Sequence, residues 1–180
     1  MREFRNNGNT GIVGNRREMV TRKYLVIEPH IDDFEIAMSV WLKKQAQFPT
    51  DIYIVTLCNG RENQDAISRT QKREANIKLF KSLYPNINII WYDAGYTDLT
   101  LESFNTAKLV LAFTETLKTA GLNGLEVINT FKEIYIPQAD NHPDHTKVNS
   151  LGKILTRAYR GKVFEYIIQN SQYMENGVWN

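Results

Sequence analysis

The 180-residue sequence has little of three features that would place it in a specialised class of protein. Its one cysteine, Cys58, excludes an internal disulfide and favours a reducing compartment such as the cytoplasm. No apolar run approaches the roughly 18 residues that span a bilayer, and the polar N-terminus lacks the apolar region of a secretory signal. We therefore expect a cytoplasmic protein with no membrane span.

The part of the chain expected to fold also lacks an excess of positive charge. Residues 1–23 carry six basic and two acidic side chains, a net charge of +4, which leaves −2 for the rest of a chain whose total is +2. A basic nucleic-acid-binding face on the folded part is therefore not expected. The Gly/Asn-rich stretch 6–15 has no apolar period, so we expect residues 1–22 to be a flexible basic leader.

The composition that is present, 42% hydrophobic, 11% aromatic and 23% charged, is that of a globular domain. Its length suits one domain, which we place at residues 23–180. Apolar runs and helical stripes alternate, which predicts an α/β fold: a Rossmann-like three-layer sandwich with helices on both faces of a mostly parallel sheet. The strands are expected at 24–27, 52–57, 87–92, 131–136 and 163–168, and the helical stripes at 34–42, 65–84, 103–120 and 144–159.

All three histidines lie in two short motifs. His30 lies in Glu28–Glu35 (EPHIDDFE), and the other two form the ends of His142–His145 (HPDH). The first motif follows the first expected strand and the second follows the fourth. Because sites in such sheets form outside the carboxyl ends of the strands, we expect the two motifs to meet. Imidazole and carboxylate are ligands that suit zinc and similar divalent ions, so the sequence predicts a metal site.

The spacing within each motif separates chemical roles. Asp32 and Asp33 are adjacent, so their side chains point in different directions and only one is expected to share the metal with His30. The other carboxylate is then available to take a proton from water. His142 and His145 face one space if a helix begins between them. Three protein ligands leave a position open for water, as in catalytic zinc sites, and a nearby imidazole as acid or oxyanion stabiliser would complete an amide hydrolase.

These motifs resemble the signatures of the LmbE-like, or GlcNAc-PI de-N-acetylase (PIG-L), family of zinc deacetylases. The family has a Pro/Ala-His-Pro-Asp-Asp-Glu stretch after its first strand and a His-Pro-Asp-His stretch late in the domain. Residues 56–62 (TLCNGRE) are similar to the family's Thr-x-Gly-Glu loop, and Arg73-Glu74 to the helix that follows. The resemblance covers about residues 23–168.

The resemblance implies a role for each residue of the two motifs. His30, Asp33 and His145 are implied as metal ligands, with Zn²⁺ as the cofactor, although this ligand set also suits Fe²⁺. Asp32 is the implied general base. His142 is implied to stabilise the tetrahedral intermediate and to protonate the leaving amine.

The family's usual reaction removes an acetyl group from an N-acetylglucosamine-type sugar. The implied function is hydrolysis of an acetamido-sugar or sugar conjugate by metal-activated water. Arg73, or Arg69 one turn earlier, is the expected contact to a polar or anionic part of this substrate. The sequence departs from the family pattern at Ile31, which replaces a proline, and at Phe34, which shifts the following acidic residue by one position. These departures affect the substrate that the resemblance implies and not the metal site, because none of them alters an implied metal ligand.

Other roles are compatible with several of these residues. Asp32 is a suitable N-cap for the helix that begins beside it, and His142 suits a fourth ligand or a hydrogen-bonding partner of a ligand. Arg69 and Arg73 also suit a solvated helix face. Cys58 is typical of a small buried residue at a strand end.

Two other functions compete with the leading one. The same hydrolysis on an acetylated amine of a nucleotide or modified base is suggested by the basic tail, and a non-catalytic sugar-binding domain would keep the fold. A dinucleotide-binding domain has no support, because no Gly-x-Gly-x-x-Gly follows the first expected strand.

Overall fold

The computed structural model describes residues 20–60, 63–119, 121–122 and 125–168. Within these residues, five strands alternate with four α-helices, and two short 3₁₀ helices occupy Leu101–Ser103 and Leu125–Thr130. The order is β1 (Arg22–His30), α1 (Asp33–Gln45), β2 (Thr50–Gly60), α2 (Asn63–Leu83), β3 (Ile87–Thr97), α3 (Thr106–Thr119), β4 (Glu133–Pro137), α4 (Pro143–Leu155) and β5 (Lys162–Tyr166).

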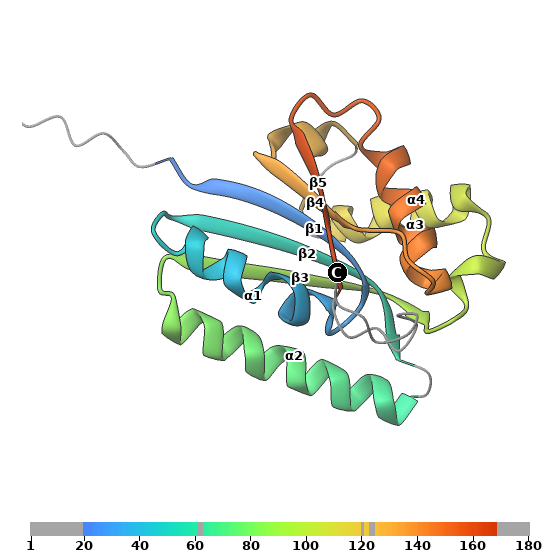
Figure 1. Ribbon diagram of the computed structural model, residues 1–180, viewed down its shortest axis with the longest axis horizontal. Helices are drawn as coiled ribbons and strands as arrows, with labels where there is room; N and C mark the ends of the chain where they lie inside the picture. Colours follow the sequence, from blue (N-terminus) through green and yellow to red (C-terminus); the bar gives the residue numbers. More distant parts are fainter. Residues whose placement is uncertain (1–19, 61–62, 120, 123–124, 169–180) are drawn as a thin grey trace, which may run out of the picture.

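The strands form one parallel sheet in the order β3-β2-β1-β4-β5. Helices α1 and α2 cover one face of this sheet, and α3 and α4 cover the other (Figure 1). The predicted α/β sandwich is confirmed, and its sheet is parallel throughout the described strands. Parallel strands need crossover connections, and the helices that make these connections supply the two outer layers.

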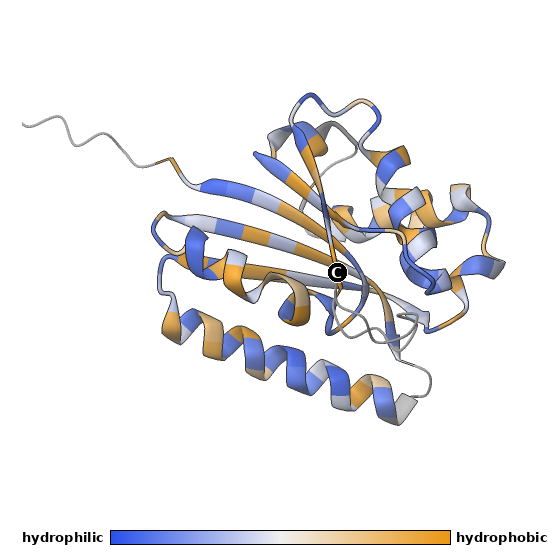
Figure 2. Cartoon of the chain, in the orientation of Figure 1, coloured by the Kyte–Doolittle hydropathy of each residue, from blue (hydrophilic) through white to orange (hydrophobic). Residues whose placement is uncertain are grey.

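The core is split between the two faces of the sheet, and β1 contributes to both. Tyr24 and Val26 pack with Phe34 of α1, whereas Leu25 and Ile27 point to the opposite face, where Phe113 of α3 lies. Successive side chains of a strand alternate between faces, so a strand buried on both sides must be apolar without interruption. Figure 2 shows this apolar character along the central strands.

The direction of winding changes at β1. From β1 the chain proceeds outward through β2 to β3, and then returns to place β4 on the other side of β1. The carboxyl ends of β1 and β4 are therefore neighbours at the switch point, where ligands bind in open α/β sheets. His30 is the last residue of β1, and His142 immediately precedes α4 after β4.

Several element boundaries differ from the expected ones. Strand β1 continues to His30 because that residue still pairs with Cys58 of β2. Helix α3 begins at Thr106 and not at Ser103, because the Asn105 side chain accepts the backbone N–H groups of Ala107 and Lys108.

The expected basic leader lies mostly outside the described residues, which begin at residue 20, and β1 already includes Arg22. Among the helices that the structure describes, none has both the length and the apolar character needed to cross a bilayer.

Helix α4 lies unusually close to β4, and a glycine makes this possible. A Cβ atom added to Gly152 would lie 2.5 Å from Cγ2 of Ile136 and 3.1 Å from its Cβ. We expect Gly152→Ala to destabilise the fold by about 1–3 kcal/mol through this overlap, although alanine is the better helix former by about 1 kcal/mol. The free energy of unfolding in urea measures this. If Gly152→Ala loses no more stability than Ser150→Ala, a change at an exposed position of the same helix, the contact relaxes and the expectation is wrong.

Candidate metal centre and active site

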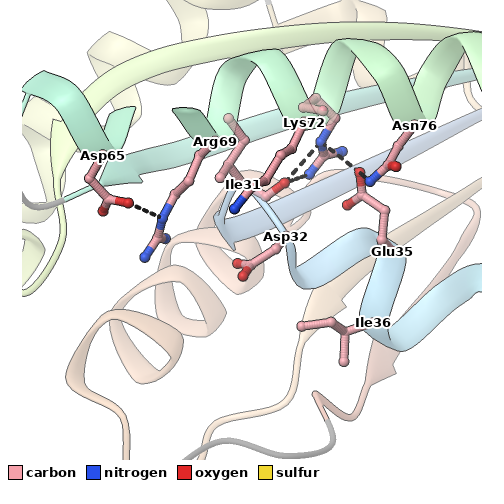
Figure 3. Close-up of a pocket in the computed structure, with 9 residues that line it drawn as sticks. Ile31, Asp32, Glu35, Ile36, Asp65, Arg69, Lys72 and Asn76 are labelled. Atoms are coloured by element: carbon pink, nitrogen blue, oxygen red, sulfur yellow. Dashed lines mark hydrogen bonds and ion pairs between the residues drawn. The ribbon is translucent and has the colours of Figure 1, made fainter. Parts of the chain in front are cut away.

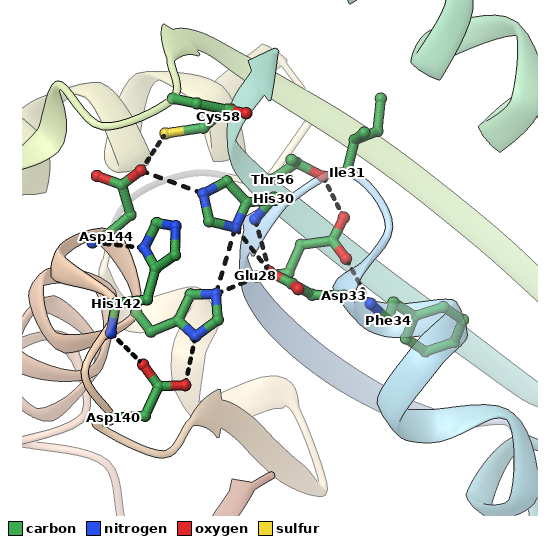
Figure 4. A network of polar contacts seen from close by, with 12 residues as sticks. Glu28, His30, Ile31, Asp33, Phe34, Thr56, Cys58, Asp140, His142 and Asp144 are labelled. Atoms are coloured by element: carbon green, nitrogen blue, oxygen red, sulfur yellow. Dashed lines mark hydrogen bonds and ion pairs between the residues drawn. The ribbon is translucent and has the colours of Figure 1, made fainter. Parts of the chain in front are cut away.

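Side chains from both motifs converge between the ends of β1 and β4 (Figure 4). His30 Nδ1 lies 3.3 Å from Asp33 Oδ2 and 3.3 Å from His145 Nε2. His145 Nε2 lies 3.9 Å from the same Asp33 oxygen. The His142 ring lies 4.7 Å from the His30 ring and 4.5 Å from the His145 ring, between centroids. The structure thus brings together the residues that the sequence predicted would meet.

This spacing fits a divalent metal ion. Zinc bonds of about 2.0–2.1 Å in tetrahedral geometry place ligand atoms about 3.3–3.4 Å apart, which is close to the separations among His30, Asp33 and His145. Two further donor sets within the described residues have ligand atoms no more than 4.8 Å apart: His30 with His142 and His145, and His30 with Cys58 and Asp144. The residues present can therefore hold an ion, and Asp33 and His142 are rival candidates for the third ligand.

The local chain explains why His30 and Asp33 face each other. Strand β1 ends at His30 and α1 begins at Asp33, so the intervening turn is very short. The Asp33 Oδ2 atom accepts the His30 backbone N–H at 2.8 Å, which closes this turn. The Asp33 side chain is buried, and this hydrogen bond compensates part of the cost of removing its carboxylate from water.

Each of the two central imidazoles has a carboxylate behind it. His30 Nε2 lies 3.1 Å from Asp144 Oδ2, and His145 Nδ1 lies 2.7 Å from Asp140 Oδ2. If each outer nitrogen donates to its carboxylate, the lone pairs of His30 Nδ1 and His145 Nε2 point toward each other and toward Asp33. Lone pairs that converge in this way favour a cation between them.

Carboxylates on both sides of the His30 ring favour a positive charge there, whether a proton or a bound cation carries it. Burial disfavours the charged form of His30, but the hydrogen bonds to Asp144 and Asp33 outweigh burial and raise its pKa to about 10. The surrounding carboxylates thus stabilise positive charge at this position. Sequence reasoning missed the orienting roles of Asp140 and Asp144, although Asp144 lies inside the HPDH motif and Asp140 lies two residues before it.

His142 occupies the N-cap position of α4, and its Nδ1 accepts the Asp144 backbone N–H at 3.1 Å. This bond leaves the ring proton on Nε2, which is therefore a hydrogen-bond donor. Burial, together with the neighbouring His30 and His145, lowers the pKa of His142 to about 4. The neutral ring suits the expected stabilisation of an oxyanion. Proton donation to a leaving group would require it to acquire a second proton first.

Asp32 is at the N-cap position of α1, but its side chain makes no capping hydrogen bond among the residues that the structure describes. The alternative of a capping side chain is therefore wrong. The exposed Asp32 carboxylate lines a cavity of about 350 Å³ between the start of α1 and α2 (Figure 3). Glu35, Arg69, Lys72 and Asn76 contribute to the same walls.

The family can now be stated from a comparison with known sequences. The model of the family described as GlcNAc-PI de-N-acetylase, PIG-L, matches residues 25–156, which is more than half of the chain. The chain belongs to the PIG-L family. The matched range includes both histidine motifs, all of β2, β3 and β4, and β1 except its first three residues. The family match and the candidate metal centre therefore concern the same part of the protein. Among curated proteins, none matches this chain in sequence.

Solved structures with the same fold include deacetylases. N,N'-diacetylchitobiose deacetylase from Pyrococcus horikoshii is 20% identical, with a TM-score of 0.53, and the match covers 76% of this chain and 49% of that protein. A deacetylase of the teicoplanin biosynthesis pathway is 14% identical with a TM-score of 0.62, covering 88% of this chain and 72% of the other. A zinc-inhibited form of teicoplanin deacetylase is 10% identical with a TM-score of 0.61 and the same coverages. This PIG-L chain thus spans about half the length of the first of these proteins.

The two arginines expected to contact substrate have different environments. Arg69 is 28% exposed at its side chain and lies at the cavity wall, with its Nε 3.2 Å from Asp65 and its Nη1 3.4 Å from Asp98. Arg73 is only 2% exposed, and its Nη2 lies 2.6 Å from Glu28. Arg73 is therefore not on a solvated helix face: its guanidinium is held against a buried carboxylate, and the residue also lines the cavity. The expected substrate contact stays a prediction for both arginines, of which Arg69 is the more exposed.

Cys58 is a buried free thiol at the end of β2. Its Sγ lies 4.0 Å from Asp144 Oδ2 and 3.6 Å from the Thr97 carbonyl oxygen. Burial, followed by the nearby carboxylates, raises the pKa of the thiol far above its usual range. Cys58 is therefore a small buried residue at a strand end, as the sequence predicted.

Proposed function

We propose that this PIG-L protein is a metal-dependent hydrolase that removes the N-acetyl group of an acetamido-sugar or sugar conjugate. The observation that carries the proposal is the convergence of donor atoms from His30, Asp33 and His145 at 3.3–3.9 Å. The names of similar structures, which include deacetylases for N,N'-diacetylchitobiose and in teicoplanin biosynthesis, support the reaction class. The proposed location is the cytoplasm, in keeping with the free thiol of Cys58.

His30, Asp33 and His145 would hold the ion, and zinc is the proposed identity because imidazole and carboxylate suit it. One similar structure is described as a zinc-inhibited form, so other divalent ions such as Fe²⁺ belong in the same test. A divalent ion bound here would lower the pKa of water and polarise a carbonyl group.

The residues of the chain supply the proton transfers. As water adds to the amide carbonyl carbon, the Asp32 carboxylate takes its proton. The Nε2–H of His142 donates a hydrogen bond to the oxygen that becomes negative. When the carbon–nitrogen bond breaks, Asp32 returns the proton to the nitrogen, and the products are acetate and a primary amine. In this scheme Asp32 is both base and acid, because His142 is neutral.

The cavity beside Asp32 suits a small polar substrate. Its volume of about 350 Å³ lies in the range of small-molecule sites, and its walls are mixed in polarity. Charged and amide side chains in these walls offer partners for the hydroxyl groups of a sugar ring. Arg69, at the wall and partly exposed, is the proposed substrate contact.

The reaction is tested by amine release. Protein loaded with Zn²⁺ or Fe²⁺ is incubated with N-acetylglucosamine and N,N'-diacetylchitobiose, and primary amine and acetate are quantified. We expect equimolar release that stops on chelation and returns when metal is restored. Metal-loaded protein that releases no amine from any acetamido-sugar would contradict the proposal.

Two substitutions decide which residue is the third ligand. If Asp33 binds the ion, Asp33→Asn weakens Zn²⁺ binding by at least about 100-fold, because loss of even an outer partner of a ligand costs about 10–100-fold. His142→Asn should leave binding within a few-fold of wild type while lowering turnover. Competition with a coloured chelator measures both dissociation constants. The opposite ranking of the two variants would make His142 the ligand.

A further inference from the structure

A buried ion pair lies against the turn that joins His30 to α1, and the proposed reaction does not use it. Glu28 is 0% exposed, Arg73 is 2% exposed, and their charged atoms are 2.6 Å apart. Removing two charges from water is costly, and such pairs often stabilise a fold no better than apolar residues of the same volume. The presence of this pair therefore calls for a reason other than stability.

The pair contacts both ends of the turn that follows His30. At one end, Arg73 donates from Nε to the Ile31 carbonyl oxygen at 2.9 Å, and its Nη2 donates to the same oxygen. At the other end, Glu28 Oε2 accepts the Phe34 backbone N–H at 2.9 Å. Between these two anchored peptide groups lie the proposed base and the proposed carboxylate ligand (Figure 4 shows the ligand beside the Glu28 contacts).

The pair is itself held by rigid elements. Thr56 of β2 donates its hydroxyl to Glu28 Oε1, and Trp91 of β3 donates its indole N–H to the Thr56 hydroxyl at 2.7 Å. Arg73 projects from the middle of α2, where Glu35 of α1 also pairs with its Nε at 3.1 Å. Three strands and two helices thus fix the position of the turn through one connected network.

The network also explains why the Asp32 side chain does not cap α1. Glu28 accepts a backbone N–H in the first turn of this helix, a function usually performed by the N-cap side chain. The N-cap carboxylate is thereby left exposed to the cavity. One buried acid in β1 therefore does the capping that would otherwise occupy the proposed base.

We propose that Glu28 and Arg73 are positioning residues for metal binding: they hold the turn from Ile31 to Phe34 so that Asp33 faces His30 at coordination distance. This inference rests on the proposed function. A functional site requires its ligand atoms to lie within about 0.5 Å of their working positions. A turn anchored at both ends holds the Asp33 carboxylate in such a position before an ion binds.

The test measures metal affinity and not only activity. Glu28→Gln keeps the side-chain shape but places an amide N–H₂ group against the Arg73 guanidinium or the Phe34 N–H. We expect Zn²⁺ binding to weaken by about 10–100-fold, as for other outer partners of metal ligands. In metal-free protein, amide hydrogen exchange at Phe34 should accelerate more than exchange at the core of β4. Thr56→Val, which removes one donor to Glu28 without touching the turn, should weaken Zn²⁺ binding by a smaller factor.

Phe113→Leu is the matched control, because Phe113 is fully buried on the opposite face of the sheet. It should lower the melting temperature of the metal-free protein while leaving Zn²⁺ affinity within about twofold of wild type. If Glu28→Gln and Thr56→Val behave like this control, the network is structural only and the inference is overturned. If Glu28→Gln does not fold, Thr56→Val alone decides. Wild-type protein that binds no divalent ion would overturn the proposed function itself, and this inference with it.

Discussion

His145→Ala is expected to abolish stoichiometric metal binding and to lower N-deacetylation by at least about 10³-fold, since a metal ion contributes several kcal/mol to such reactions and each 1.36 kcal/mol is a factor of ten. The imidazole supplies the only donor from α4 in the proposed ligand set, and its Nε2 lies 3.3 Å from His30 Nδ1. Without it, His30 and Asp33 offer only two protein ligands. Elemental analysis of the purified protein and the amine-release assay measure the two effects.

Ser150→Ala, at an exposed position of the same helix, is the control and should retain metal and activity. Dialysis of wild-type protein against a chelator should reproduce the loss of activity, and added Zn²⁺ should restore it in wild type but not in His145→Ala. A variant that keeps one ion per chain would show that the ion is bound elsewhere.

Asp32→Asn is expected to lower turnover by about 10²–10⁴-fold, the usual contribution of a general acid–base group. Metal content and stability should be unchanged, because the Asp32 side chain is exposed and makes no capping hydrogen bond among the described residues. The substitution keeps the shape of the side chain and removes only its ability to accept a proton. The amine-release rate, the Zn²⁺ dissociation constant and the melting temperature together separate these effects.

Glu74→Gln removes one negative charge from an exposed position of α2 and should leave the rate near that of wild type. Full activity in Asp32→Asn would exclude this carboxylate as the base. Loss of metal in Asp32→Asn would instead assign it to the ligand set, in place of its neighbour Asp33.

The different burial of the two arginines could not be predicted from the sequence. Arg69 and Arg73 are four residues apart on one helix, so the sequence alone cannot tell which of them is buried. In the structure both line the cavity, but Arg73 is buried and pairs with Glu28 of β1 and Glu35 of α1, whereas Arg69 is partly exposed. The pairing of Arg73 with Glu28 could not be predicted from the sequence. An acidic residue near the end of an apolar strand is equally typical of a functional site and of an ordinary strand end.

The sequence by itself determined the order of strands and helices, the two-sided burial of the sheet and the two histidine motifs, since these depend on local periodicity and on turn residues. Only the tertiary structure decided which carboxylate faces each imidazole. The contact of His30 with Asp144 joins positions 114 residues apart, and it exists because β4 is placed beside β1. Strand order is a property of the whole chain, and side chains that face one another across a sheet carry no sequence signal of their partner.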